Sequence, residues 1–304
     1  MSHTGECATG NPLGAAYYAD RALHGRAAVV ENVRLARDTY RVRLDWPELG
    51  RRIVPGQFVM LRLPAGNDPL LGRPLALYDT WCETDGTPLG IDVVYLTIGK
   101  MTRRLAGMRP GDDLEVWGPL GNGFSTPPAE HLIMVAGGIG QTPFVALGRE
   151  ALGQRRYGEP GRPGPGVKRV TLCYGVRSAE YLAGVEDFKQ AGAEVRVSSD
   201  DGSVGRQGLV TELLAELLDE ELLKSEASKG IRIACCGPEK MMEAVAHLAA
   251  ARGVPCEVSL ETPMACGIGI CFSCVVKVRQ LDGGWDYKRT CVEGPIFAAE
   301  KIEW

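Results

Sequence analysis

Apolar residues follow two different patterns along this chain, and the first occupies its N-terminal third. From Ala27 to about Phe124, short runs of alternating apolar and polar residues, rich in β-branched side chains, are separated by Gly, Pro and Asp. A period of two is typical of strands with one buried face. The pattern therefore predicts an antiparallel β-barrel. The runs lie at 27–35, 39–46, 57–64, 91–99 and 112–121.

The second pattern begins near His131, where brief and almost entirely apolar runs alternate with helical periodicity. Continuous apolar strands separated by helices indicate a parallel sheet covered on both faces. We therefore expect an α/β domain after the barrel. The apolar runs lie at 131–138, 169–176, 193–199 and 230–237, and the clearest helical patterns lie at 208–225 and 238–253.

The length of 304 residues suggests two domains and a short appendage, so the predicted fold class is multi-domain α+β. The last segment, roughly 45 residues, is too short to bury a large core unaided. A stretch rich in Gly, Pro and Arg at 153–168 predicts an exposed loop outside the core. The predicted domains are an N-terminal extension at 1–25, a barrel at 26–126, an α/β domain at 127–258 and a cysteine-rich segment at 259–304.

Composition excludes several classes of protein. Apolar residues make up 45% and charged residues 24%, which is typical of globular proteins. A net charge of -4 without a basic patch argues against nucleic-acid binding. No run of 18 apolar residues indicates a membrane span, and the first 25 residues do not resemble a secretory signal. We therefore expect a cytoplasmic protein with a small-molecule or protein partner.

Four cysteines near the C-terminus have the spacing C-x4-C-x2-C-x16-C, which matches the plant-type pattern for a [2Fe-2S] cluster. Gly267 and Gly269 suit a loop that turns tightly and brings backbone N–H groups toward the sulfurs. A four-cysteine zinc site is the alternative, but zinc sites usually pair two short C-x2-C knuckles, and only one is present. The pattern favours iron–sulfur. The predicted ligands are Cys266, Cys271, Cys274 and Cys291.

Two motifs in the predicted barrel are compatible with a bound diphosphate. In "LLGRPLALYD", Arg73 at the end of a strand can direct its guanidinium toward phosphate while Pro74 fixes the backbone. About twenty residues later, Gly99 and Thr102 mark a turn and a helix start whose N–H groups could receive phosphate. An ordinary capped helix with nothing bound is the alternative at this second motif.

Two turns in the predicted α/β domain are candidates for a nucleotide site. In "MVAGGIGQTPFVAL", Gly137, Gly138 and Gly140 follow an apolar strand and open a helix, which allows close approach of a phosphate. The fourth strand ends in Cys236 and a Gly-Pro turn at the carboxyl edge, where open α/β sheets place ligands. We expect Cys236 beside a nicotinamide, with buried packing as the alternative.

The order of these motifs resembles the ferredoxin-NADP reductase superfamily of flavoprotein reductases. The resemblance rests on "RPLA", "AGGIGQTP", "SSDDGSVGRQGLVTEL" and "CGP" in sequence. The C-terminal "MACGIGICFSC" and "YKRTCVEGPIF" narrow it to the electron-transfer subunits of class B, NAD-dependent dihydroorotate dehydrogenases. This resemblance implies FAD in the barrel, NAD(H) in the α/β domain and a [2Fe-2S] cluster on the four cysteines.

The resemblance also implies site residues. The expected FAD contacts are Arg73, Pro74, Leu75, Ala76, Val94, Tyr95, Leu96, Met101 and Thr102. The expected nicotinamide nucleotide contacts are Gly137, Gly138, Gly140, Thr142, Cys236, Gly237 and Pro238. Ala76 stands where the family usually has serine, so a hydroxyl near the flavin is missing. Met101 stands where it usually has glycine, which is expected to crowd the diphosphate turn.

The implied function is an oxidoreductase subunit that passes electrons from NADH through FAD and the cluster to the FMN of a separate catalytic subunit in a heterotetramer. A flavin is needed because hydride carries two electrons and the cluster accepts one. The rival partners are a cytosolic hydrogenase, a sulfide reductase or a ferredoxin-linked transhydrogenase. A non-enzymatic metal-binding module is a third possibility. Asp200 and Asp201 could repel the 2′-phosphate of NADPH, which favours NADH, or could cap a turn.

Overall fold

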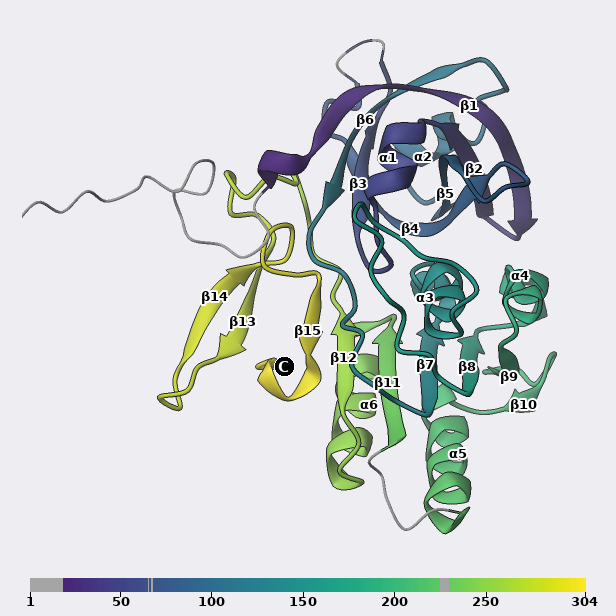
Figure 1. The fold of residues 1–304 in the computed structure, drawn as a ribbon, viewed down its shortest axis with the longest axis vertical. Coiled ribbons are helices and arrows are strands. Elements are labelled where there is room, and N and C mark those ends of the chain that lie inside the picture. The colour runs from purple at the N-terminus through teal and green to yellow at the C-terminus, as the bar shows by residue number, and fades with distance from the viewer. Residues whose placement is uncertain (1–18, 65, 67, 225–229) are drawn as a thin grey trace, which may run out of the picture.

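The computed structural model describes residues 19–64, 66, 68–224 and 230–304 (Figure 1). A closed barrel, an α/β domain and a C-terminal segment follow one another along the chain. Most of the predicted N-terminal extension lies outside the described residues. In the described part of the chain, no helix combines the length and apolar character that a membrane span requires.

The barrel has the strand order β1-β2-β5-β4-β3-β6, with antiparallel neighbours throughout. Its interior is apolar, and Val42, Leu44 and Val93 are fully buried. The strands are β1 (Leu23–Ala36), β2 (Thr39–Asp45), β3 (Phe58–Arg62), β4 (Arg73–Cys82), β5 (Pro88–Leu96) and β6 (Asp113–Leu120), and the helices are η1 (Ala19–Arg21), α1 (Pro47–Arg52) and α2 (Lys100–Leu105).

Strand β4 corrects the expectation for the Arg-Pro motif. Arg73 and Pro74 begin this strand instead of ending one. The strand was absent from the predicted runs because two buried polar residues, Asp79 and Thr80, interrupt the apolar alternation. The carboxylate of Asp79 pairs with Arg149 of helix α3 (Phe144–Ala151) at 3.0 Å, so its partner is distant in sequence.

The α/β domain is a sheet with the order β10-β9-β8-β7-β11-β12-β15, parallel from β10 to β12. Helices α5 and α6 pack on one face and α3 and α4 on the other, which confirms the predicted class. The strands are β7 (His131–Gly137), β8 (Arg169–Val176), β9 (Glu194–Ser199), β10 (Arg206–Gln207), β11 (Ile231–Cys236) and β12 (Cys256–Ser259). The helices are η2 (Gly138–Gln141), α3 (Phe144–Ala151), η3 (Ala179–Tyr181), α4 (Val185–Gln190), α5 (Val210–Lys224) and α6 (Glu239–Ala251).

The C-terminal segment shares a core with the α/β domain. It consists of a two-stranded hairpin of β13 (Val275–Arg279) and β14 (Trp285–Arg289), then β15 (Ile296–Ala298) and η5 (Ala299–Lys301). Strand β15 pairs antiparallel with β12, and Val278 and Ile302 are buried in the same apolar cluster as α5 and α6. The small segment therefore obtains its apolar burial from its neighbour.

The composition of the loop at 153–168 predicted an exposed segment, but the structure shows that parts of this loop are buried. Tyr157 is buried in the barrel core and donates its hydroxyl to Asp79 at 2.7 Å. Arg162 forms a bidentate pair, 2.7 Å for each bond, with the fully buried carboxylate of Glu150. Composition could not reveal these anchors because each partner lies in a different element.

Candidate functional site

One cavity of about 320 Å³ lies where the barrel, the α/β domain and the C-terminal segment meet. Such a junction is where ligand sites commonly form. Arg73 and Glu261 are the charged residues of its lining. The remaining lining residues are Gly56, Phe58, Pro74, Leu75, Ala76, Val94, Tyr95, Leu96, Ile98, Gly99, Thr102, Ile139, Thr142, Cys236, Ser259, Leu260, Thr262, Met264 and Pro295.

The barrel wall of the cavity consists mainly of the first residues of β4 and the last residues of β5. Arg73 Nη1 donates to the carbonyl oxygens of Leu71 and Gly72, each at 3.0 Å, which holds the guanidinium beside the cavity. Tyr95 lines the same wall, and its hydroxyl donates to Asn32 Oδ1 at 3.0 Å. This wall is therefore apolar with one fixed cation, a combination that suits a ring and a diphosphate.

Met101 does not crowd this cavity, contrary to the expectation from the sequence. Its side chain is fully buried in the barrel core with Leu105, and it is not among the lining residues. Thr102 does line the cavity, and its hydroxyl accepts the Gly99 N–H at 3.1 Å. The buried residues of α2 are Met101, Thr102 and Leu105, and the spacing of four residues places Met101 and Leu105 on the face that packs on the barrel core.

The glycine turn after β7 packs against the Cys236-Gly237-Pro238 turn after β11. A Cβ on Gly137 would lie 2.8 Å from Pro238 Cδ, and one on Gly140 would overlap the Cys236 carbonyl oxygen. Gly138 has φ +55° and no atom within 4 Å of its Cβ position. Gly137 and Gly140 are therefore required for turn-to-turn packing, and Gly138 is the one of the three glycines whose Cβ position is open.

Cys236 is both packed and part of the cavity lining. Its side chain is 3% exposed, and burial raises the pKa of the thiol well above its usual range. Thr142 and Ile139, from the turn opposite, line the cavity with it. Cys236 is therefore a neutral thiol at the edge of the cavity.

Glu261 is a residue that sequence reasoning missed. It lies two residues after the end of β12, and burial raises the pKa of its carboxyl. The apolar run before it, ending at Leu260, was the available signal, because carboxyl ends of parallel strands face the ligand crevice. A carboxylate and Arg73 thus bring opposite charges to one cavity.

The four predicted cysteine ligands lie together on the C-terminal segment. Cys274 Sγ and Cys291 Sγ are 3.2 Å apart, and hydrogen bonding within this pair lowers the pKa of Cys274 and raises that of Cys291. Hydrogen bonds, chiefly from Ser273 and also from Cys266, lower the pKa of Cys271 to about 6. The four thiols therefore form two pairs, and each pair contains one thiol with a lowered pKa. A lowered pKa favours the thiolate, which is the form of cysteine that binds metal.

This arrangement fits a centre of two irons. Across residues 19–304, apart from the few not described, no three His, Cys, Asp or Glu side chains converge as they would on a single ion. Two cysteine pairs match a centre in which each iron has two thiolates. The N–H of Ile268 already points at Cys266 Sγ, at 3.4 Å, and Gly267 and Gly269 adopt φ +72° and +81°.

The cysteine loop packs against the barrel and reaches the surface. Trp117 of the barrel donates its indole N–H to the Cys266 carbonyl at 3.0 Å, and Gly267 packs against Met60. On the other side Cys271 is exposed, and Arg289 donates to the Gly269 carbonyl at 3.0 Å. A group held here would touch the barrel on one side and solvent on the other.

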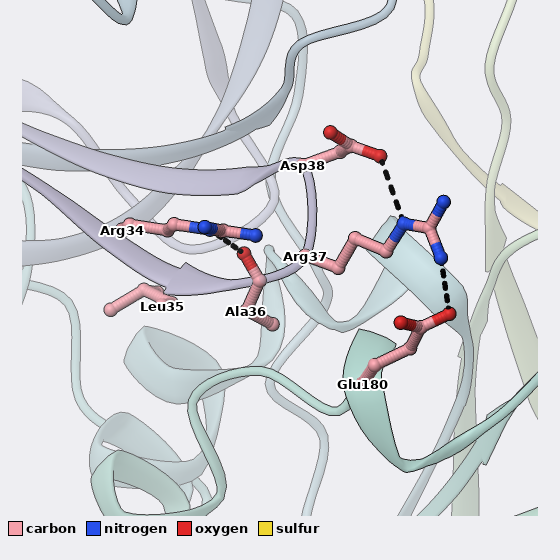
Figure 2. A pocket seen from close by; sticks show the side chains of 6 residues that line it. All are labelled: Arg34, Leu35, Ala36, Arg37, Asp38 and Glu180. Atoms are coloured by element: carbon pink, nitrogen blue, oxygen red, sulfur yellow. Dashed lines mark hydrogen bonds and ion pairs between the residues drawn. The ribbon is translucent and has the colours of Figure 1, made fainter.

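A second hollow, about 580 Å³, lies between the β1–β2 turn and η3 (Figure 2). Arg37 Nη1 donates to Glu180 Oε1 at 2.6 Å, and both side chains are half exposed. Arg34 donates to the Ala36 carbonyl at 3.1 Å. This hollow contains none of the predicted site residues. The ion pair of Arg37 and Glu180 in it joins the barrel to the α/β domain.

A barrel that shares a cavity with a glycine-turn α/β sheet, followed by a four-cysteine segment, defines the class of iron–sulfur flavoprotein reductases that use a pyridine nucleotide. Family models match each part: the oxidoreductase FAD-binding domain at residues 26–124, the oxidoreductase NAD-binding domain at 134–247, and the iron-sulfur cluster binding domain of dihydroorotate dehydrogenase B at 261–303. The chain belongs to the family of electron transfer subunits of dihydroorotate dehydrogenase B (NAD(+)).

The relatives match most of the chain. The electron transfer subunit of Desulforamulus reducens is 35% identical over 280 residues, 91% of this chain and 97% of that protein. The electron transfer subunit of Caldanaerobacter subterraneus is 33% identical over 277 residues, which cover 91% of this chain and 97% of that protein. A chain in the solved structure of an NADH-dependent reduced ferredoxin-NADP oxidoreductase is 29% identical, with a TM-score of 0.73. The match covers 91% of this chain and 90% of the solved chain. These matches favour an oxidoreductase subunit over a non-enzymatic module.

Proposed function

We propose that this chain carries electrons between NAD(H) and the FMN of a dihydroorotate dehydrogenase catalytic subunit, through FAD and a [2Fe-2S] cluster, in pyrimidine biosynthesis. The observation that carries the proposal is a cavity bordered by all three parts, with the cysteine loop packed against the same barrel. The proposed assembly is a cytoplasmic heterotetramer with the catalytic subunit. Dihydroorotate chemistry belongs to that subunit.

The barrel wall holds FAD in this proposal. Arg73 pairs with the diphosphate, and the turn from Gly99 to Thr102 adds backbone N–H groups. Met101 contributes its backbone only, because its side chain is buried in the core. The proposed ring-side contacts are Pro74, Leu75, Ala76, Val94, Tyr95 and Leu96. Ala76 offers no hydroxyl, so any hydrogen bond to the flavin from this position comes from its backbone.

The nicotinamide nucleotide approaches from the α/β side. Gly138 has open space for a phosphate, and Thr142 and Cys236 border the cavity where the reacting rings would meet. Gly137, Gly140, Gly237 and Pro238 fix the two turns. FAD, when bound, supplies the conversion between a two-electron hydride and single electrons. The chain's own residues orient the rings, exclude water and set the local charge.

Replacing Glu261 with glutamine is expected to weaken NAD⁺ binding about fivefold relative to NADH, because a carboxylate favours the cationic ring by about 1 kcal/mol at such a site. Fluorescence titration of the FAD-loaded protein with each nucleotide measures the ratio. Since burial raises the pKa of Glu261, the preference of the wild type should fade as pH falls through that raised value. Glu243→Gln, on the outer face of α6, is the control, and an unchanged ratio in Glu261→Gln would contradict the prediction.

Replacing Asp200 with serine is expected to raise kcat/KM for NADPH about tenfold, or roughly 1.4 kcal/mol, with little effect on NADH. Asp200 is exposed just past the carboxyl end of β9, and among the described residues its carboxylate has no hydrogen-bond donor. Asp201 instead accepts the Ser203 N–H at 2.9 Å and caps the turn. Steady-state dye reduction tests this, and Asp201→Ser should leave nucleotide preference unchanged.

Cofactor content tests the proposed function. Purified anaerobically, the protein should contain one FAD and two irons per chain and should reduce dyes with NADH without dihydroorotate activity. Zinc in place of iron would defeat the proposal, as would the absence of flavin.

A second candidate is a subunit of a ferredoxin-linked transhydrogenase. It is favoured by the 29% identical solved chain, which matches this chain over 91% of its length. The curated relatives, at 31–35% identity, favour dihydroorotate dehydrogenase. Affinity purification from the native organism separates the two, because an FMN-containing catalytic subunit should copurify in one case and a larger flavoprotein in the other.

A further inference from the structure

Within the part of the chain that the structure describes, the strongly exposed aromatic side chains lie in one small region. Among the described residues, Phe272, Trp285 and Tyr287 are the large aromatic residues that are strongly exposed, at 60%, 48% and 52%. Ile270 and Leu281, both highly exposed, belong to the same stretch. Apolar side chains gathered in this way mark interaction sites, whereas scattered single ones do not.

The register of the β13–β14 hairpin explains this exposure. Tyr287 lies opposite Lys277 and Trp285 lies opposite Arg279, so all four side chains point from one face. The other face carries Val278, which is buried in the α/β core. The hairpin projects from the body of the molecule (Figure 1), and its outward face is aromatic where a solvated strand would be polar.

Packing on the outward face preorganises the two rings. Trp285 and Tyr287 meet edge to face with centroids 5.1 Å apart, and Lys277 Nζ lies 4.4 Å from the Trp285 centroid. In the described chain Lys277 has no carboxylate partner, whereas Arg279 pairs with Glu303 at 2.7 Å. The face therefore presents rigid aromatic area and one uncompensated cation.

The face continues to the cysteine loop. Phe272 holds φ +57°, which is unfavourable for a residue with a side chain, and its ring lies 5.2 Å from the Arg289 guanidinium. Arg289 is the residue of β14 opposite Val275, on the same face as Tyr287. Between Ile270 and Phe272 lies Cys271, the exposed cysteine of the four. The aromatic face thus borders the solvent side of the proposed cluster.

We propose that the outward face of the β13–β14 hairpin, together with the loop tip at 270–272, is the docking surface for the catalytic subunit. The inference rests on the proposed function. The barrel side of the cysteine loop is covered by Trp117 and Met60, so electrons leave on the Cys271 side, and a subunit seated there would cover this face. The complementary patch is an apolar pocket with an acidic rim that faces Lys277.

The double variant Trp285→Ala/Tyr287→Ala tests the surface. Replacing an aromatic residue at the centre of an interface with alanine lowers the binding free energy by at least about 2 kcal/mol. We therefore expect the purified catalytic subunit to bind at least about thirtyfold more weakly. Calorimetric titration of the FAD- and iron-loaded protein measures this. Iron content, FAD content and NADH-dye reduction should match the wild type, because neither residue lines the cavity. Lys277→Glu should slow association and reduce its dependence on salt.

Leu209→Ala is the matched control, since Leu209 is 60% exposed on the α/β domain. Equal affinity of the double variant and the wild type would overturn the docking surface and leave the proposed function standing. If the double variant loses self-association but binds the catalytic subunit with unchanged affinity, the face binds a second copy of this chain. That result would also overturn the proposed docking surface for the catalytic subunit. If the wild type itself does not bind, both inferences fall together.

Discussion

Replacing Cys291 with serine is expected to remove iron from this protein and to lower electron transfer to the catalytic subunit by at least about a hundredfold. Changes to residues around metal ligands already cost about 10–100-fold in affinity or activity, and the loss of a ligand costs more. Cys291 is buried, and its Sγ lies 3.2 Å from Cys274 Sγ. Because the position is enclosed, no side chain from elsewhere in the protein can take over its role as a ligand. Iron analysis and electron paramagnetic resonance of the reduced protein measure the loss.

Cys82→Ser is the matched control for this experiment. Cys82 is a partly exposed cysteine at the end of β4, far along the chain from the four predicted ligands. Its replacement should leave two irons and one FAD per chain. Retention of a full iron complement in Cys291→Ser would contradict the ligand assignment.

Replacing Gly140 with alanine is expected to lower the rate of flavin reduction by NADH about a hundredfold and to destabilise the α/β domain by about 3 kcal/mol. The added methyl group would overlap the Cys236 carbonyl oxygen and lie 2.7 Å from the Gly237 nitrogen, and both are backbone atoms that cannot rotate away. The two turns must then separate, and the nucleotide loses the surface that they form. Stopped-flow absorbance and thermal unfolding measure the two effects.

Gly138→Ala separates this clash from the general cost of substituting a glycine. Gly138 has a positive φ, +55°, and its Cβ position is open, so alanine there costs only about 1 kcal/mol of backbone strain. A Gly140→Ala protein as stable as Gly138→Ala would show that the turns do not pack as described.

The sequence predicted the architecture and the iron–sulfur segment because both depend on local signals. Alternating apolar residues indicate a strand with one buried face, and the spacing of the four cysteines predicts a loop around two irons. Family membership agrees with the resemblance carried by "MACGIGICFSC". In each case the informative residues are close in sequence to the structure that they specify.

The misjudged positions depend on partners that are distant in sequence. The Met101 side chain was expected to crowd the diphosphate turn, but the first turn of α2 directs it into the barrel core. Tyr157 lies in a loop with a composition typical of exposed segments, yet its hydroxyl reaches Asp79, 78 residues away. Glu261 follows a four-residue strand that was not recognised. None of these contacts leaves a periodic signal in the sequence.

The most direct test is NADH-dependent reduction of orotate by this chain copurified with the catalytic subunit. The complex should contain FAD, FMN and a [2Fe-2S] cluster and should couple NADH oxidation to dihydroorotate formation, whereas the catalytic subunit alone should not use NADH. A fully loaded complex that oxidises NADH with dyes but never with orotate would contradict the proposed function.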